Sequence, residues 1–357
     1  MHFYEASIIT TKDGMHCQVY GNEHPIKSII VKPKYIPTDK IESDVLPFRF
    51  IAGRRMNRLN LWIDYKKLKE YIESFKKAYP EYILNSDLHN ENRLFFSVPI
   101  DKIERIYFPR RGFSELIRID DSHLDSYLRQ VKELGNLFMQ AGLQAKDIGV
   151  TYSTLMGHYN SEVSDINFVI YGNGNFWKLM KFLETAKHPK LRWKTKDDWL
   201  EFYRKRARSK IFSQEQFLKV KERNKSEGFF NNILFVIFCA EKEEEVWFKW
   251  GREKYTDKGY VKITAEVEDN FNSAARPGMY KIKNCKVLEG EKVDVEKIVF
   301  YSRDYAMIAK PGEKIEASGV LEEVKSKDNG LYYRIVIGYF DSYISERREG
   351  EYIKVIE

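Results

Sequence analysis

Cysteine is scarce in this sequence, and the few cysteines form no recognisable motif. Cys17, Cys239 and Cys285 are far apart, with no CxxC pair. An odd number without such pairs excludes a disulfide framework and a zinc knuckle. The seven histidines are also scattered, and none pairs with another at the helical spacing of metal ligands. We therefore expect a reducing compartment, the cytoplasm.

Long hydrophobic runs are missing as well. The longest unbroken apolar run, Ile233 to Ala240, has eight residues, too few to cross a bilayer. The first five residues lack the basic and apolar regions of a signal peptide. We expect neither secretion nor membrane insertion. Glutamine is scarce whereas Lys, Glu, Ile and Tyr are plentiful, a bias seen in thermophile proteins.

The length predicts more than one domain. A chain of 357 residues is too long for one typical core. Residues 1–118 have the mixed pattern of an N-terminal α/β domain, in which 28–36 is an edge strand or extended segment containing Pro33 and 61–79 is a helix. Residues 119–276 form a second domain and 277–357 a third. The overall expectation is an α+β protein.

The positive charge is concentrated in one segment. The net charge is +7, from 60 Lys and Arg against 53 Asp and Glu, and residues 192–227 carry twelve Lys and Arg against six acids. Cations interleaved with aromatic rings suit a phosphate backbone with stacked bases. The alternative is a solvated helix whose aromatic residues face the core. The candidate nucleic-acid-binding residues are Trp199, Tyr203, Arg204, Lys205, Arg206 and Arg208.

The middle domain alternates helices and strands. A capped apolar stripe predicts a helix over 124–138 that Gly142 ends. Strands are predicted at 148–152 and 166–171, with a helix at 176–185 and a further strand at 228–240. This order favours an α/β layer.

In the C-terminal domain, apolar and polar residues alternate with a period of two, which is typical of short strands. Residues 260–267, which precede this domain, and 281–288, 295–302, 314–324 and 331–339 are strand candidates, and Asn329-Gly330 predicts a hairpin. Five short strands in about 80 residues suggest a small closed β-barrel, for example of the oligonucleotide-binding (OB) type.

The informative motif lies between residues 149 and 172. Ser153 and Asp165 are separated by eleven residues, and the segment from Ser164 reads SDINFVIYG. This segment resembles the signature of the DNA polymerase beta-like nucleotidyltransferase superfamily, in which a Gly-Ser pair opens a helix and Asp-x-Asp follows on a strand. Segments 21–25, 34–37, 277–280, 288–290, 313–322 and 332–338 are similar to an archaeal group of predicted nucleotidyltransferases.

The resemblance implies a nucleotidyltransferase-like core with a defined site. Ser153 and Gly157 would line a phosphate pocket, and Asp165 with position 167 would hold divalent metal, since residues two apart on a strand point to the same side. Two metal ions, Mg²⁺ or Mn²⁺, would then clamp the attacking hydroxyl and the triphosphate. A third carboxylate would come from a later strand, and the candidates are Glu266, Glu268 and Glu241.

Two positions depart from the family pattern. Position 167 is Asn, whose neutral amide replaces a carboxylate that Mg²⁺ prefers. Position 152, where the family has Gly, is Tyr, a side chain that would crowd a triphosphate. Together these changes indicate a degenerate active site.

The leading hypothesis is a nucleotidyltransferase-fold protein that binds nucleoside triphosphate or nucleic acid, RNA or DNA, without efficient transfer. It would need no cofactor, although Asp165 could keep one weak metal ion. One alternative is an active Mg²⁺- or Mn²⁺-dependent nucleotidyltransferase that uses Asp165, Asn167 and a remote Glu such as Glu266. Another is a non-catalytic scaffold subunit that contacts a protein partner.

Overall fold

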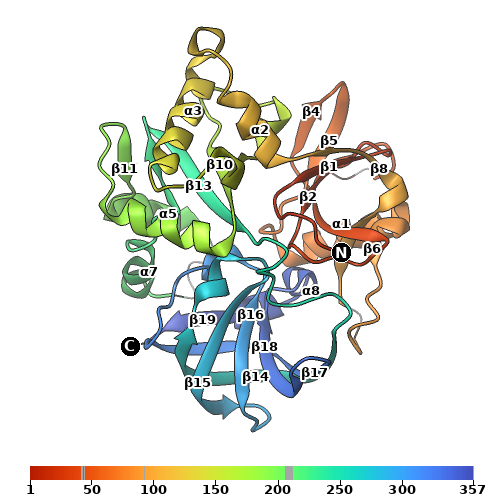
Figure 1. Ribbon diagram of the computed structural model, residues 1–357. Helices are drawn as coiled ribbons and strands as arrows, with labels where there is room; N and C mark the ends of the chain where they lie inside the picture. Colours follow the sequence, from red (N-terminus) through yellow and green to blue (C-terminus); the bar gives the residue numbers. More distant parts are fainter. Residues whose placement is uncertain (42, 44, 92, 206–211, 357) are drawn as a thin grey trace. The chain divides into compact units, whose positions relative to one another are not determined.

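The computed structural model describes residues 1–41, 43, 45–91, 93–205 and 212–356. The chain has the expected α+β class, with several sheets and helices (Figure 1). It divides into two compact units. Unit 1 contains residues 1–3, 9–106 and 246–357, and unit 2 contains residues 4–8 and 107–245. Within the described residues, no helix is long and apolar enough to cross a membrane.

The first sheet of unit 1 has the strand order β4-β5-β3-β2-β1-β8, and β7 pairs with β3 and β6. The strands are β1 (Ile8–Thr11), β2 (His16–Val19), β3 (Ser28–Pro37), β4 (Phe48–Ile51), β5 (Arg54–Arg58), β6 (Ile83–Leu84), β7 (Phe95–Pro99) and β8 (Ile103–Tyr107). The predicted edge position of β3 is wrong, because β3 pairs with β2 on one side and with β5 and β7 on the other. Pro33 lies between the parts of β3 that pair with β7 and β5, so its missing N–H breaks neither ladder.

The predicted N-terminal helix forms as α1 (Tyr65–Ala78). Its start is set by Asp64, whose carboxylate accepts hydrogen bonds from the backbone N–H groups of Lys66 and Lys67, both at 3.1 Å. Its buried face is the predicted apolar stripe, Leu68, Tyr71, Ile72 and Phe75.

The second sheet of unit 1 has the order β14-β15-β16-β18-β17-β19. Its strands are β14 (Glu253–Asp269), β15 (Gly278–Glu289), β16 (Val295–Phe300), β17 (Lys314–Ser326), β18 (Gly330–Ile337) and β19 (Tyr352–Val355). A further pairing joins β17 back to β14, so the pairings of five strands return to their start. The pair β16–β18 is parallel, and the other neighbours are antiparallel. The predicted hairpin at Asn329-Gly330 joins β17 to β18.

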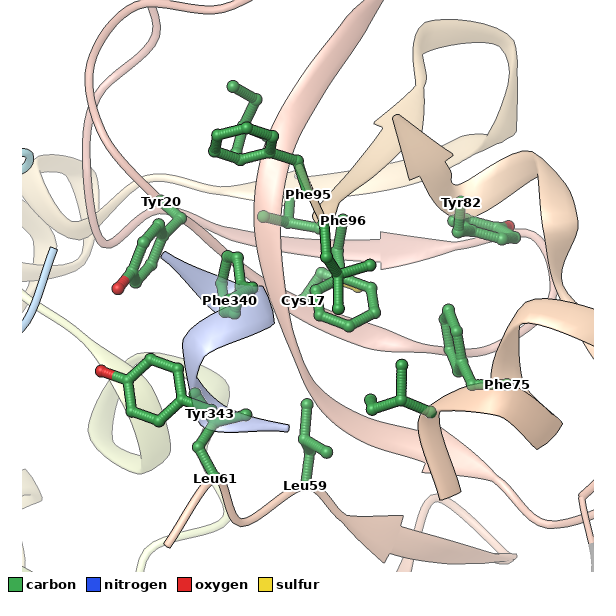
Figure 2. Packing of buried hydrophobic residues seen from close by; sticks show 14 of the residues in the cluster. Cys17, Tyr20, Leu59, Leu61, Phe75, Tyr82, Phe95, Phe96, Phe340 and Tyr343 are labelled. Carbon is green, nitrogen blue, oxygen red and sulfur yellow. The ribbon is translucent and has the colours of Figure 1, made fainter. Parts of the chain in front are cut away.

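The core of unit 1 unites the two ends of the chain. The helix α8 (Phe340–Tyr343) contributes Phe340, whose ring centroid lies 5.0 Å from that of Tyr20 and 5.2 Å from that of Phe96. Figure 2 shows Phe340 and Tyr343 among buried residues of the N-terminal segment. The remaining short helix of this region is α9 (Arg347–Gly350).

Unit 2 is built on the sheet β11-β12-β13-β10-β9. Its strands are β9 (Ile148–Val150), β10 (Ile166–Tyr171), β11 (Leu191–Trp193), β12 (Glu227–Phe230) and β13 (Ile233–Ala240). β10 and β13 are parallel, and β9 is antiparallel to β10. The helices are α2 (Pro109–Leu116), α3 (Ser126–Met139), α4 (Tyr152–Met156), α5 (Asn173–Thr185), α6 (Lys196–Lys205) and α7 (Gln214–Lys221).

One strand prediction in unit 2 is wrong. Residues 228–240 form two antiparallel strands, β12 and β13. The backbone reverses at Asn231 and Asn232, which have φ values of 48° and 65°. Asparagine tolerates this left-handed region, and two such residues make the tight turn of a hairpin.

The three-domain division predicted from the sequence differs from these two units. The boundary at 276/277 would separate β14 from its partner β15. The boundary at 118/119 ignores the segment around Ala6, which packs with Val169, Tyr171 and Ala240 of unit 2. The first difference concerns two consecutive strands that pair across the predicted boundary. The second arises from packing between residues distant in sequence, which no local pattern records.

Candidate functional site

The signature segment is a short turn of helix between two antiparallel strands, β9 and β10. Thr151 fixes its entry, since this residue is completely buried. Its hydroxyl donates to the carbonyl oxygen of Ala6 at 2.7 Å, and its backbone N–H donates to the carbonyl oxygen of Asn167 at 3.0 Å. The backbone that precedes α4 is therefore held by two other segments of unit 2.

Tyr152 occupies the position of the signature glycine. Its φ is 55°, in the left-handed region that favours glycine. Its ring packs edge-on against Phe238, with centroids 5.6 Å apart. The backbone of this turn therefore has a glycine-like conformation, although the side chain is among the largest.

Asp165 and Asn167 stand at the start of β10. Asp165 is half-buried, and its carbonyl oxygen accepts a hydrogen bond of 2.9 Å from the hydroxyl of Tyr127. The same hydroxyl lies 2.8 Å from Oγ1 of Thr154 in α4. Tyr127 thus connects α3, α4 and the residue before β10. Asn167 is buried, with 5 % of its surface exposed.

Ser153 and Gly157 lie at the two ends of the short helix α4. Ser153 is half-buried, and its carbonyl oxygen accepts the N–H of His158 at 3.1 Å. Gly157 has φ 72° and ends the helix, and a Cβ there would meet no atom within 4 Å. The two residues remain candidates for contact with phosphate.

Glu241 cannot complete a carboxylate pair with Asp165. Ile166 pairs with Phe235, so Asp165 lies at one end of the parallel pair β10–β13, and Glu241 follows the other end. The six residues of β10 separate the two ends by roughly 20 Å at about 3.3 Å per residue. Glu241 is fully buried and lies 3.5 Å from the amide nitrogen of Asn173.

Glu266 belongs to unit 1, on β14, whereas Asp165 belongs to unit 2. Its carboxylate accepts from the Lys283 ammonium at 3.1 Å and from the Asn284 amide at 3.2 Å. The Lys283 ammonium lowers the pKa of Glu266. Glu266 therefore belongs to a surface ion pair with Lys283. Glu268 is exposed on the same strand.

The described residues contain no group of three His, Cys, Asp or Glu side chains suited to a metal ion. The strand next to β10, Ile233–Ala240, contains no acidic residue. Asp165 with a neutral amide at 167 is a poor match to a pair of Mg²⁺ ions, which prefer several anionic oxygens. The residues present do not fit the two-metal centre that the signature implies.

The basic segment is partly explained by packing. Trp199 is 1 % exposed, with Phe202 and Phe217 at centroid distances of 5.9 and 6.3 Å and the Lys194 ammonium 4.2 Å from its ring centroid. The ring has no free face on which a base could stack, so the predicted stacking role of Trp199 is wrong. The alternative interpretation, a helix whose aromatic residues face the core, is correct for Trp199.

The other residues of this segment differ in exposure. The Tyr203 hydroxyl donates to the carbonyl oxygen of Phe212 at 2.7 Å, and the ring is half-buried. Arg204 and Lys205 are exposed at the end of α6, where Lys205 pairs with Glu201. Arg206 and Arg208 lie outside the described residues.

Unit 1 contains an aromatic pocket that the sequence analysis missed. Part of it is open to solvent, and the space within it for water-sized groups is about 30 Å³. Its walls include Tyr20, Phe95, Trp247, Trp250, Tyr255 and Tyr301. The signal in the sequence was the cluster Trp247-Phe248-Lys249-Trp250.

A buried ionic network borders the pocket at Arg334. The guanidinium Nε and Nη2 of Arg334 lie 2.9 and 2.8 Å from Oε2 of Glu322, whose other oxygen accepts from the Tyr339 hydroxyl at 2.9 Å. The guanidinium also lies 3.8 Å from the ring centroid of Tyr255. The His89 imidazole contacts the Tyr339 hydroxyl at 3.2 Å, and burial lowers the pKa of His89 to about 3. His89 is therefore neutral at physiological pH.

The chain is similar to uncharacterized protein MJ1086 of Methanocaldococcus jannaschii. The two are 29 % identical over 351 residues, which cover 95 % of this chain and 98 % of that protein. The similarity therefore extends over both units. No protein-family profile matches the chain, and no solved structure matches it.

Proposed function

We propose that this chain is a nucleotidyltransferase-like protein that binds nucleotide or nucleic acid and does not perform metal-dependent transfer. The observation that carries the proposal is the composition of the sheet edge where β10 begins. Asp165 and Asn167 lie there, and the neighbouring strand β13 supplies no acidic side chain. A site with one carboxylate lacks the charge to hold paired Mg²⁺.

Two features of unit 2 support the relationship to nucleotidyltransferases. The sequence signature falls on the element order β9-α4-β10, with its Ser at the beginning of the helix and its Asp directly before the strand. The signature glycine is replaced by Tyr152, which has a left-handed φ of 55°. A residue that adopts a glycine conformation is expected where the backbone of an ancestral motif is retained.

The second sheet of unit 1 supports binding to nucleic acid by its shape. The pairings of β14, β15, β16, β18 and β17 return to β14, as in small closed barrels, which include the oligonucleotide-binding type. The strand pairing supports only the type of fold. The contacts with nucleic acid would be made by side chains. Arg204 and Lys205 are exposed cations suited to phosphate.

The first test measures whether nucleotide binding requires metal. Labelled ATP is titrated into the protein with Mg²⁺ and again with EDTA, for the wild type, Asp165→Ala and Ser153→Ala. We expect ATP to bind with similar affinity in EDTA, to tolerate Asp165→Ala, and to weaken with Ser153→Ala. Binding lost both in EDTA and in Asp165→Ala would contradict the proposal. Quenching of Trp247 and Trp250 fluorescence by ATP would instead place the base in the aromatic pocket.

The second test concerns nucleic acid. Labelled single-stranded RNA and DNA are titrated at several salt concentrations against the wild type and Arg204→Ala/Lys205→Ala. The double variant should weaken binding and flatten its salt dependence, because each lost phosphate contact removes one released counterion. A control that removes two exposed cations elsewhere in unit 2, Lys181→Ala/Lys187→Ala, should bind as the wild type. Equal effects of the two variants would show that only net charge matters and would exclude α6 as the binding surface.

A further inference from the structure

The edge strand β4 of the first sheet of unit 1 has unused backbone hydrogen-bonding groups. It stands at the end of the strand order and pairs only with β5 among the described residues. The N–H of Arg58 donates to the carbonyl oxygen of Pro47 at 2.7 Å, and bonded pairs alternate along an antiparallel ladder. The N–H and C=O groups of Phe48 and Phe50 therefore point away from β5. Within the described part of the chain, no residue forms a hydrogen bond with these four groups.

The two faces of the β4–β5 hairpin carry different side chains. Phe48 and Phe50 lie on one face of β4 and are 59 % and 76 % exposed. Arg49 lies on the other face, where its partner across the hairpin is Met56. Arg58 is two residues beyond Met56 and therefore shares the face of Arg49. The hairpin thus has an aromatic face and a cationic face.

Two arginines of the cationic face have no acidic partner among the described residues. Between residues 47 and 59 the sequence contains four arginines and neither Asp nor Glu. Arg54 forms an ion pair with Asp39. Arg49 and Arg58 are exposed and form no ion pair with any residue that the structure describes. Two such cations on one face attract a negatively charged partner.

Protection of the edge against aggregation does not explain this composition. Proteins block exposed edge strands with proline, a β-bulge or charged side chains. β4 contains no proline and pairs with β5 without a register shift. Arg49 is the one charged residue of β4, and the exposed rings on either side of it promote association.

These features fit an extended protein segment better than nucleic acid or a second copy of this chain. An added strand uses the free N–H and C=O groups, which a phosphodiester backbone does not match. The rings and the unpaired arginines lie on opposite faces, so one nucleotide could not reach both with its base and its phosphate. A second copy that paired through β4 would bring further arginines to the cationic face. Opposite charge therefore favours a different, acidic chain.

We propose that β4 is the docking edge for an acidic, extended segment of a protein partner. The segment adds to the sheet as a strand beside β4 and forms hydrogen bonds with the backbone of Phe48 and Phe50. Its side chains alternate between the two faces. Apolar side chains pack on the two rings, and the acidic side chains between them pair with Arg49 and Arg58. This surface is independent of the nucleotide and nucleic-acid binding proposed above.

The experiment uses fluorescence anisotropy of a labelled nonapeptide in which glutamate and valine alternate, with the full chain at low salt. The comparison probes are a peptide of the same composition with its valines and glutamates in blocks, and a peptide with lysine in place of glutamate. We expect the alternating acidic peptide to bind at least tenfold more tightly than either comparison probe. No binding, or equal binding of the three peptides, would overturn the proposal.

Charge reversal locates the binding surface. Arg49→Glu/Arg58→Glu should lower the affinity for the glutamate peptide at least tenfold and raise the affinity for the lysine peptide. The matched control Lys67→Glu/Lys69→Glu reverses two exposed cations of α1 and should leave both affinities within twofold of the wild type. An unchanged preference in the hairpin variant, or an equal change in the control, would overturn the proposal.

Phe50→Pro tests the addition of a strand. Proline removes the outward N–H of residue 50 and leaves the hydrogen bonds from β4 to β5 in place, so peptide binding should be lost. Phe50→Ala removes only the ring and should weaken binding less. Equal losses would show that the backbone makes no contact and would overturn strand addition. Should Phe50→Pro disrupt the hairpin, the charge-reversal variants decide, because their side chains are exposed.

Two further measurements address the other occupants of the edge. Analytical ultracentrifugation should show no dimer that depends on β4. A dimer abolished by Phe50→Pro would assign the edge to a second copy and overturn the proposal. Oligonucleotide binding that is lost in Phe48→Ala/Phe50→Ala would assign the rings to nucleic acid and overturn it as well.

Discussion

The guanidinium of Arg334 and the carboxylate of Glu322 form an ion pair of 2.8 Å in a position almost closed to solvent, with side-chain exposures of 4 % and 1 %. Arg334 also lies 3.8 Å from the buried carboxylate of Glu253, so removing Arg334 leaves two buried carboxylates without this cation. Arg334→Met should therefore reduce the free energy of unfolding by about 3–5 kcal/mol. Denaturant unfolding of the purified protein measures this change.

The double variant Arg334→Met/Glu322→Leu separates this ion pair from general loss of packing. If the two charges depend on each other, the double variant should be more stable than the sum of the single variants predicts, by about 2 kcal/mol. Additive single and double variants would show that the pair contributes no coupling.

A buried histidine predicts loss of stability in acid. Burial lowers the pKa of His24 to about 3, and both ring nitrogens contact backbone, with Nδ1 accepting from Ile30 at 3.1 Å and Nε2 facing the carbonyl oxygen of Phe3 at 3.2 Å. Below pH 6.5 the His24 imidazole is protonated in the unfolded chain but stays neutral in the folded chain. His24 therefore lowers the free energy of unfolding by about 1.4 kcal/mol per pH unit as the pH falls toward 3.

Unfolding free energies at pH 7, 6 and 5 for the wild type and His24→Gln test this effect. The variant should be less stable at pH 7 and should show a shallower decrease toward pH 5. Parallel pH profiles would mean that His24 does not titrate between the folded and unfolded states.

The left-handed backbone at Tyr152 predicts an unusual preference for glycine. Tyr152→Gly and Tyr152→Ala both lose the ring contact with Phe238. The glycine variant should nevertheless be the more stable by about 1 kcal/mol, because glycine adopts a positive φ without a Cβ penalty. Thermal unfolding of the two variants compares them directly, and an alanine variant of equal stability would refute the conformational argument.

Because Trp199 is buried, we expect its replacement to lower the stability of the protein. Trp199→Ala should cost about 3–5 kcal/mol of stability through loss of its packing. Arg204→Ala at the exposed end of the same helix should change stability by less than about 0.5 kcal/mol. A stable Trp199→Ala variant with reduced nucleic-acid affinity would restore the stacking role that the sequence suggested.

Local patterns predicted many elements of this fold. The stripe ending at Phe75, the capped helix that contains Val131 and the apolar segment at Ile166 all lie where their periodicity placed them. The prediction of a single strand over 228–240 did not treat Asn231-Asn232 as the turn signal that interrupts the apolar residues on either side. Only the left-handed backbone separates β12 from β13.

Long-range packing could not be predicted. Nothing near Phe340 indicates that it packs against Tyr20, more than three hundred residues earlier. The burial of Trp199 could not be predicted either. A helix with aromatic and basic residues is compatible both with rings packed in the core and with rings that stack on a ligand. The exposure of Phe48 was missed since a short alternating strand carries no sign of which face is covered.

The central claim is that a sheet edge with Asp165 as its single carboxylate does not support nucleotidyl transfer. The most direct measurement incubates the protein with each labelled nucleoside triphosphate, Mg²⁺ or Mn²⁺, and RNA or DNA acceptors. We predict no incorporation by the wild type and none by Asp165→Ala. Incorporation by the wild type that Asp165→Ala abolishes would contradict it.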